Sequence, residues 1–319
     1  MYALRKKSPI VALLLADIHL GVKVPIAREE EPSWFSAMAR PWLEVGNLIR
    51  DAKKVYGAPP AVLCAGDIFD RWNSPPEMIN WALEHLPTMY AIPGNHDLPN
   101  HRPELAHRSA YGTLVRAGKI IELDSVAKRI YNLDVYGQPF NDEVPIPLQS
   151  DKVVKVLVTH EYLWTAGTGF AGAPRESKLS TVAKKFSGFD VVVVGDNHIG
   201  FERRLKGGTF VFNCGALIRR KASEAIHHPR VGLLKMDGTV VIHQLDTSKD
   251  KLTREVSLEQ EQSEEYRGEV SDFVEGLVGL EADELSFQDA IVREMKARKL
   301  SQPVQDILLG AMNANTKDH

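Results

Sequence analysis

Residues 9–21 read Pro-Ile-Val-Ala-Leu-Leu-Leu-Ala-Asp-Ile-His-Leu-Gly. Arg5, Lys6 and Lys7 precede this apolar run, as in a secretory signal, but the run ends in Asp17 and His19 rather than in a small-residue cleavage site. It is also shorter than the roughly 20 residues that span a bilayer. We therefore interpret it as a buried first strand.

Four further apolar runs cover residues 60–65, 88–93, 153–159 and 189–195. Each is followed at once by side chains that can bind a metal. Because ligands of open α/β sheets bind outside the carboxyl ends of the strands, we expect these side chains to converge on one site. After the five runs in order come Asp17 and His19; Asp67 and Asp70; Asn95, His96 and Asp97; His160; and Asp196, Asn197 and His198.

Helical patterns lie between the runs, over residues 42–55 and 75–86, the second with Ser74 as its expected N-cap. Strands that alternate with helices predict an α/β sheet covered on both faces. Residues 209–213 and 231–243, with turns at Gly207-Gly208 and Asp237-Gly238, indicate hairpins that close the same domain. On the first helical face we expect Trp42, Val45, Leu48, Ile49 and Val55.

The five blocks, in order, resemble the calcineurin-like metallophosphoesterases, whose pattern is DxH, GDxxD, GNH(D/E), a lone His and GHxH. The resemblance covers residues 9 to about 245. The stretches LADIHLG, AGDIFD and YAIPGNHDLP are most similar to the SbcD-type DNA-repair and recombination nucleases of bacteria and phages. The resemblance implies a four-layer αββα sandwich for residues 1–245.

The resemblance also implies two divalent metal ions, one held by Asp17, His19, Asp67 and His198, the other by Asp67, Asn95, His160 and Asp196. Mixed oxygen and imidazole ligands suit Mn²⁺, with Fe²⁺, Zn²⁺ or Mg²⁺ as alternatives. His96 would act as the general acid toward the leaving oxygen, and Asp70 would orient its imidazole. The implied reaction is attack by metal-bound hydroxide on a phosphodiester.

Two positions depart from the family pattern. The last motif reads Gly-Asp-Asn-His, so Asp196 stands where a metal-binding His is expected. A carboxylate can still bind the metal, and the alternative is that Asp196 has lost the role and the second metal binds weakly. Asp70 is the other departure, because many of the recombination nucleases carry His there.

A basic stretch follows the last motif and is the candidate for contacts to the DNA backbone. The alternative is a solvated face without function. A second segment, with Trp34, Phe35 and Trp42, could line the active-site groove, although core or dimer packing is the simpler interpretation. The predicted substrate-binding residues of the basic stretch are Arg203, Arg204, Arg219, Arg220 and Lys221, with Lys206, His227, His228 and Arg230 beside them and Glu202 and Glu224 as the acids among them.

Charge divides the chain of 319 residues unevenly. Residues 246–319 contain 9 Lys and Arg against 17 Asp and Glu, whereas the rest of the chain has a net charge of +5. We expect a metallophosphoesterase domain over 1–245, a charged linker over 246–270 and a helical extension over 271–319. The extension could dock a partner or cap the domain, and its last helical pattern follows Ser301 and Pro303.

The leading hypothesis is a two-metal DNA exonuclease, with endonuclease activity also conceivable, that acts in recombination or repair. The resemblance implies a homodimer and an SMC-like ATPase partner of the SbcC type. Because no apolar stretch approaches the roughly 20 residues that span a bilayer, we expect no membrane association. The two cysteines, Cys64 and Cys214, form no CxxC pair, which favours a reduced, cytoplasmic setting. Two alternatives stay open: a metallophosphoesterase for a small nucleotide, cyclic nucleotide or phosphoprotein, and a non-catalytic scaffold of the same fold.

Overall fold

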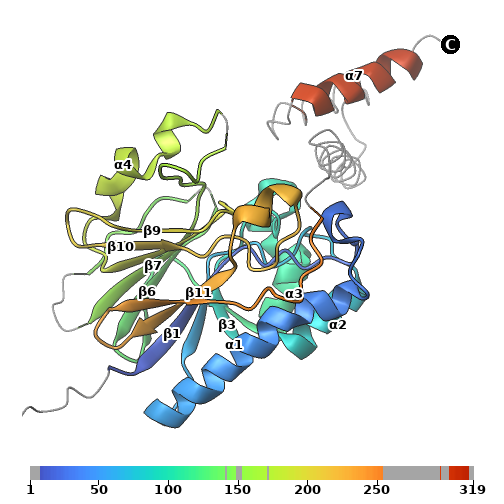
Figure 1. The fold of residues 1–319 in the computed structure, drawn as a ribbon. Coiled ribbons are helices and arrows are strands. Elements are labelled where there is room, and N and C mark those ends of the chain that lie inside the picture. Colours follow the sequence, from blue (N-terminus) through green and yellow to red (C-terminus); the bar gives the residue numbers. More distant parts are fainter. Residues whose placement is uncertain are drawn as a thin grey trace, which may run out of the picture.

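The protein is described by a computed structural model over residues 8–140, 142–148, 153–170, 172–253, 295 and 302–315. Two six-stranded mixed sheets pack face to face (Figure 1). The first has the order β12-β11-β1-β2-β3-β4 and the second β5-β6-β7-β8-β10-β9. The strands are β1 (Ile10–Leu15), β2 (Ala61–Cys64), β3 (Met89–Ala91), β4 (Ile120–Glu122), β5 (Lys128–Ile130), β6 (Leu133–Gln138), β7 (Val154–His160), β8 (Val191–Gly195), β9 (Phe201–Arg204), β10 (Phe210–Asn213), β11 (Arg230–Lys235) and β12 (Val240–Gln244).

Strand direction places the chemistry at one edge of the sandwich. In the first sheet β1, β2, β3 and β4 run parallel, and in the second β6, β7, β8 and β10 run parallel. The carboxyl ends of β1, β2, β3, β7 and β8 are the points at which the five motifs begin. The αββα sandwich expected from the sequence is therefore confirmed, with the motifs at its carboxyl edge.

Both faces of the second sheet are covered, as the side chains of β8 show. Val191 and Val193 belong to the core between the sheets, whereas Val192 and Val194 belong to a separate outer cluster with Leu179 and Phe186. Successive side chains of a strand point to opposite faces, so this alternation requires apolar cover on each side. The outer cover is short, because it consists of α4 (Leu179–Val182) and the 3-10 turns at Arg175–Ser177 and Ala183–Phe186.

Longer helices cover the first sheet: α1 (Trp34–Tyr56), α2 (Pro76–His85) and α3 (Ala110–Arg116). Helix α1 begins eight residues before the predicted helix, because Ser33 caps it and accepts a hydrogen bond from the N–H of Ser36. Trp34 and Trp42 are buried in the core, which excludes them from the rim of the site. Two details of the prediction are wrong, since Val55 is exposed and Ser74 does not cap α2.

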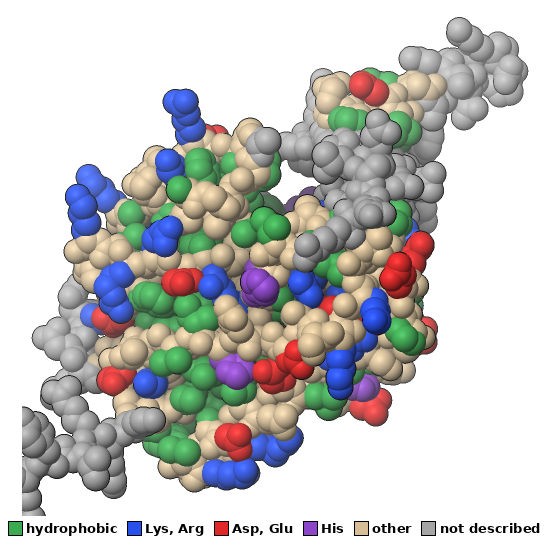
Figure 2. All heavy atoms as spheres, in the orientation of Figure 1, with side chains coloured by type: hydrophobic (Ala, Val, Ile, Leu, Met, Phe, Trp, Pro, Cys, Tyr) green, Lys and Arg blue, Asp and Glu red, His purple; other side chains and the backbone are tan. Residues whose placement is uncertain are grey.

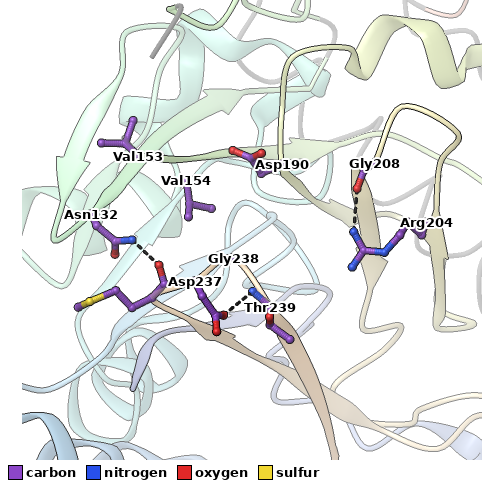
Figure 3. Close-up of a pocket in the computed structure, with 10 residues that line it drawn as sticks. Asn132, Val153, Val154, Asp190, Arg204, Gly208, Asp237, Gly238 and Thr239 are labelled. Carbon is purple, nitrogen blue, oxygen red and sulfur yellow. Dashed lines mark hydrogen bonds between the residues drawn. The ribbon is translucent and has the colours of Figure 1, made fainter. Parts of the chain in front are cut away.

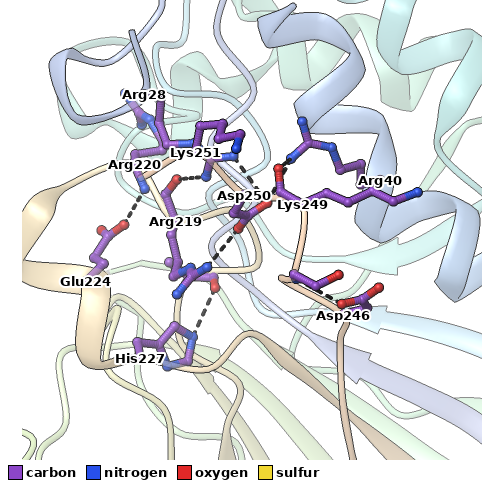
Figure 4. Close-up of polar contacts among 12 residues, drawn as sticks. Arg28, Arg40, Arg219, Arg220, Glu224, His227, Asp246, Lys249, Asp250 and Lys251 are labelled. Atoms are coloured by element: carbon purple, nitrogen blue, oxygen red, sulfur yellow. Dashed lines mark hydrogen bonds and ion pairs between the residues drawn. The ribbon is translucent and has the colours of Figure 1, made fainter. Parts of the chain in front are cut away.

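The predicted linker is attached to the domain at its start. Residues 246–253 lie against the segment before α1, where the carboxylate of Asp250 accepts from Arg28, Arg40 and Arg219 (Figure 4). The N–H of Lys251 also donates to Glu31, at 2.8 Å. The first eight residues of the predicted linker are thus part of the folded domain, although their charge pattern alone resembles that of a solvated connection.

The helical extension is described only in part. Helix α7 (Gln302–Asn315) matches the last helical pattern expected in the extension, and Val304 and Leu308 on it are buried. The part of the extension before residue 302 lies outside the described residues, apart from Met295, which is buried. No helix in the described part of the chain is both long and apolar enough to cross a membrane.

Candidate metal centre

Four residues of the five motifs adopt a backbone conformation that L-amino acids rarely populate. Asp17, His19, Asp67 and Asp196 have φ values of 51°, 50°, 53° and 76°. Such strained non-glycine residues cluster at functional sites, where the surrounding structure enforces them. Here the loops after β1 and β2 are joined by backbone hydrogen bonds, for example from the N–H of His19 to the carbonyl of Asp67 at 3.0 Å. The strain is thus imposed where the motif side chains meet.

The first group of ligand atoms joins three motifs. The Nε2 atoms of His19 and His198 are 2.9 Å apart, and His19 Nε2 lies 3.6 Å from Asp67 Oδ2. Asp17 places a ligand atom within the same cluster as His19 and His198. Its Oδ1 accepts from the N–H of Asp196, whereas its Oδ2 is buried without a hydrogen-bond partner. A buried, unpartnered carboxylate oxygen is costly unless a cation satisfies it.

The second group lies around His160. Its Nδ1 donates to the carbonyl of Ala65 at 2.7 Å, so the neutral ring leaves the Nε2 lone pair free. That Nε2 faces Asp67 Oδ2 at 3.4 Å and Asn95 Oδ1 at 2.9 Å. In this neutral form, three electron pairs meet without a proton between them, an arrangement that a metal ion fits. Asp67 Oδ2 thus lies between His19 and His160, as a bridging ligand would.

The pKa shifts of the candidate ligands also fit a site for divalent cations. Burial raises the pKa of Asp17 to about 7, even though His198 and His160 act in the opposite direction. Burial lowers the pKa of His19, which favours the neutral imidazole that binds metals. Burial opposes a charge on His160 as well, but Asp67, Asp196 and Asp17 outweigh it and raise its pKa. The raised pKa of His160 means that carboxylates dominate its surroundings, and divalent cations would neutralise the same carboxylates.

Asp196 stands apart from the other predicted ligands. Its charge acts on His160, and its backbone N–H donates to Asp17. However, Asp196 belongs to none of the three groups of His, Cys, Asp and Glu in the described residues whose ligand atoms lie close enough to share an ion. The structure thus places it beside the second group, and its role as a ligand stays a prediction.

His96 lies at the open side of this cluster. Its side chain is exposed, and its ring contacts that of His19 edge to face, with the centroids 5.0 Å apart. The Nδ1 of His96 donates to the backbone carbonyl of Asp70 at 2.9 Å. The Asp70 carboxylate instead pairs with Arg220, which helps to lower its pKa although burial acts to raise it. The expected orientation of His96 therefore comes from the carbonyl of Asp70 rather than its carboxylate.

Glu224 is a site residue that appears in the sequence only as an acid within the basic stretch. Its Oε1 accepts from His198 Nδ1 at 2.8 Å, and its Oε2 accepts from the N–H groups of Arg220 and Lys221. Figure 4 shows the hydrogen bond between Arg220 and Glu224. Burial acts to raise its pKa, but these hydrogen bonds and the His198 charge lower it to about 2. Glu224 thus fixes the proton of His198 on Nδ1 and directs Nε2 toward the cluster.

Asp97 is a second residue with a role that the motif did not reveal. It is fully buried and accepts hydrogen bonds from the N–H groups of Ile68, Phe69 and Gly94. The side chain therefore joins the loop after β2 to the loop after β3. At Gly94 any Cβ would overlap the carboxylate of Asp67, so the two loops approach too closely for another residue.

The structure separates the residues of the basic stretch. Arg219 is buried and paired with Asp250, so the prediction that it contacts substrate is wrong. Arg203 and Arg204 are exposed on β9, which runs antiparallel to β10 and away from the site. Only Arg220 and Lys221 lie close enough to act electrostatically on His19 and His198, respectively. On the face drawn in Figure 2, Lys and Arg side chains are spread over the surface rather than gathered in one patch.

A cavity of about 400 Å³ lies elsewhere, at the edge where the parallel strands begin (Figure 3). Arg204, Asp190 and Asp237 line it, together with the starting residues of β7. None of its lining residues belongs to the three metal-capable groups of the described chain. The cavity and the candidate metal centre are therefore separate features.

The chain is similar to known proteins in sequence and in structure. No curated protein matches the sequence. Among solved structures, similarity is found to a metallophosphoesterase from Sphaerobacter thermophilus (13% identity, TM-score 0.35, covering 90% of this chain and 99% of that one). It is also found to the Thermus thermophilus sulfate thiohydrolase SoxB (13%, 0.40, 84% and 60%) and to a 5'-nucleotidase precursor from Thermus thermophilus (11%, 0.39, 84% and 59%). The family model for the calcineurin-like phosphoesterases matches residues 10–200, more than half of the sequence, and the chain belongs to that family.

Proposed function

We propose that the chain is a two-metal DNA phosphodiesterase of the SbcD type, an exonuclease that could also cut internally, in recombination or repair. The observation that carries the phosphoesterase chemistry is the placement of Asp67 Oδ2 between His19 and His160, beside the exposed His96. The choice of DNA as substrate is supported by the motif sequences LADIHLG, AGDIFD and YAIPGNHDLP.

Two cations, Mn²⁺ in the first instance, would occupy the two groups of side chains. Asp17, His19, Asp67 and His198 would hold one; Asp67, Asn95 and His160, with Asp196 beside them, would hold the other. When bound, such ions would activate water and neutralise the phosphate oxygens. The donor set supports this assignment because it offers both imidazole nitrogens and carboxylate or amide oxygens.

The remaining residues of the site would bind substrate and move protons. His96 donates through Nδ1 to Asp70, so its Nε2 is the atom available to give a proton to the leaving oxygen. Arg220 is partly exposed beside Asp70 and would attract the phosphodiester. Glu224 keeps His198 in the tautomer that binds a metal.

The partners belong to the same proposal. We infer a homodimer and an SMC-like ATPase of the SbcC type, by the resemblance of the motifs. The acidic region after residue 253, with the exposed Ile307 and Leu309 on α7, is the candidate for docking the ATPase. Co-purification of the full chain with a candidate ATPase, and its loss in the double variant Ile307→Asp and Leu309→Asp, tests this part.

The experiment for the activity compares two substrates with Mn²⁺: end-labelled linear double-stranded DNA and bis-p-nitrophenyl phosphate. We expect both to be hydrolysed, and His96→Ala and Asp67→Asn to abolish turnover. His107→Ala is the matched control, because His107 is also exposed and its Nδ1 also bonds a backbone carbonyl, at 3.0 Å.

Each outcome of this comparison is informative. Hydrolysis of the small ester with intact DNA would overturn the DNA assignment in favour of the small-nucleotide alternative. No hydrolysis of either substrate would favour the non-catalytic scaffold. DNA degradation that persists in His96→Ala and Asp67→Asn would refute the residue assignments.

A further inference from the structure

A pair of aromatic rings, one partly buried and one exposed, lies in the loop next to the candidate metal centre. The loop that follows β7 contains Tyr162, two residues after His160, and Phe170. The two rings have centroids 5.3 Å apart at an angle of 48°, and the N–H of Phe170 donates to the Tyr162 hydroxyl at 3.4 Å. Phe170 is 61% exposed, so a ligand that covers its ring would gain the free energy of burying that apolar surface.

The loop is attached to the last metal motif rather than free. Asn197 is buried, and its Nδ2 donates to the carbonyls of Leu163 at 2.8 Å and Thr168 at 3.0 Å. Leu163 is itself buried in the outer apolar cluster. The side chain of Asn197, between Asp196 and His198, therefore sets the position of the aromatic pair relative to the motif.

Tyr162 is the member of the pair that follows the centre most closely along the chain, because it lies two residues after His160, the last residue of β7. Phe170 lies farther along the same loop. An extended substrate strand whose phosphate lies at the metal centre would pass this pair with its next nucleotide.

From this geometry we propose that Phe170 and Tyr162 form a stacking platform for the nucleobase next to the reacting phosphate. The proposal rests on the proposed function, because it narrows the substrate from any phosphodiester to one that carries a nucleobase. Aromatic rings bind bases of any identity through their π-faces, so the platform would add affinity without sequence preference. Tyr162 supports the Phe170 ring, and Phe170 supplies the exposed face.

The experiment measures binding separately from cleavage. A short single strand with 2-aminopurine next to the target phosphate is titrated with the full chain in EDTA, where stacking quenches the base fluorescence. We expect quenching with the wild type and with Phe170→Trp, which keeps an aromatic face. Phe170→Ala and Phe170→Leu should lose the quenching and bind the strand about ten-fold more weakly, within the range known for base stacking on aromatic side chains.

Two controls test whether the contact of Phe170 is with the base rather than with the rest of the strand. Leu43→Ala removes a comparable exposed apolar side chain, 70% exposed on α1, and should change nothing. A strand with an abasic site at the same position should bind the wild type and Phe170→Ala equally well. With Mn²⁺ present, Phe170→Ala should lower kcat/KM about ten-fold for the normal strand and leave the abasic strand unaffected.

The results separate this inference from the proposed function. Quenching that is lost in Phe170→Ala supports the platform even if the wild type cuts no DNA, in which case the nuclease assignment alone fails. Equal quenching in the wild type and Phe170→Ala overturns the platform even if DNA is cut. An equal loss of binding for the normal and abasic strands also overturns it, because the contact would then not involve the base.

Discussion

Substituting Glu224→Gln changes one atom and should reverse the tautomer of a proposed metal ligand. The carboxylate now accepts from His198 Nδ1 through one oxygen and from two backbone N–H groups through the other. In glutamine the remaining oxygen would serve the two backbone donors, so the amide NH₂ would face Nδ1. Because NH₂ only donates, the proton of His198 would move to Nε2, the atom that lies 2.9 Å from His19 Nε2.

The Glu224→Gln substitution should weaken metal binding and also destabilise the folded protein. Loss of a carboxylate that orients a ligating histidine weakens metal affinity by about 10- to 100-fold, or roughly 1.4 to 2.7 kcal/mol. In the metal-free protein the pKa of Glu224 falls from 4.5 to about 2, so its ionised form stabilises the fold above pH 4.5 and this stabilisation is lost as the pH falls toward 2. At neutral pH the variant should therefore be less stable by about 3 kcal/mol.

Isothermal titration calorimetry with Mn²⁺ at about pH 7.5, on protein stripped with EDTA, measures the effect. One of two binding steps should weaken in Glu224→Gln. Glu202→Gln is the matched control, since Glu202 lies in the same basic stretch but pairs with Arg230 on the surface. Wild-type affinities for both ions in Glu224→Gln would refute the role assigned to this carboxylate.

Three other predictions concern residues outside this pair. Gly94→Ala should abolish Mn²⁺ binding in the same titration, because its Cβ would overlap Asp67. The control Gly46→Ala, on α1, meets no such overlap and should raise the melting temperature. Metal binding retained by Gly94→Ala would contradict this prediction. Burial lowers the pKa of His227 from 6.5 to about 4. The neutral ring therefore makes its full contribution to the free energy of unfolding above pH 6.5, and this contribution is lost as the pH falls to 4. Between about pH 7 and pH 4, urea unfolding of the wild type should show a loss of about 3 kcal/mol in the free energy of unfolding, and His227→Gln should lack this loss. Identical pH profiles of the two proteins would exclude this role of His227. Asp250→Asn should lower the unfolding free energy by about 3 kcal/mol, because it leaves buried arginines without their shared carboxylate, and an unchanged urea midpoint would show that the ion pairs contribute nothing.

Local sequence was sufficient for the elements that carry the motifs. An apolar run such as residues 10–15 must be buried on both faces wherever it lies, and the polar residues that end it must lie at a sheet edge. For this reason β1, β2, β3, β7 and β8 and their terminal side chains could be predicted. In contrast, β4 and β5 are three-residue strands that contain the charged residues Glu122, Lys128 and Arg129, and β6 contains Asp134 and Gly137, so no continuous apolar run distinguished them.

The sequence by itself determined which residue types stand at the carboxyl ends of the strands, and with them the family and the chemistry. Only the tertiary structure decided which groups lie at the candidate site: Glu224 rather than Glu202, Arg220 rather than Arg219, and, against His96, the carbonyl rather than the carboxylate of Asp70. The reason is physical. A strand end is a local property, whereas the partner of a charge depends on segments as distant in sequence as Arg28 and Asp250, which only packing brings together.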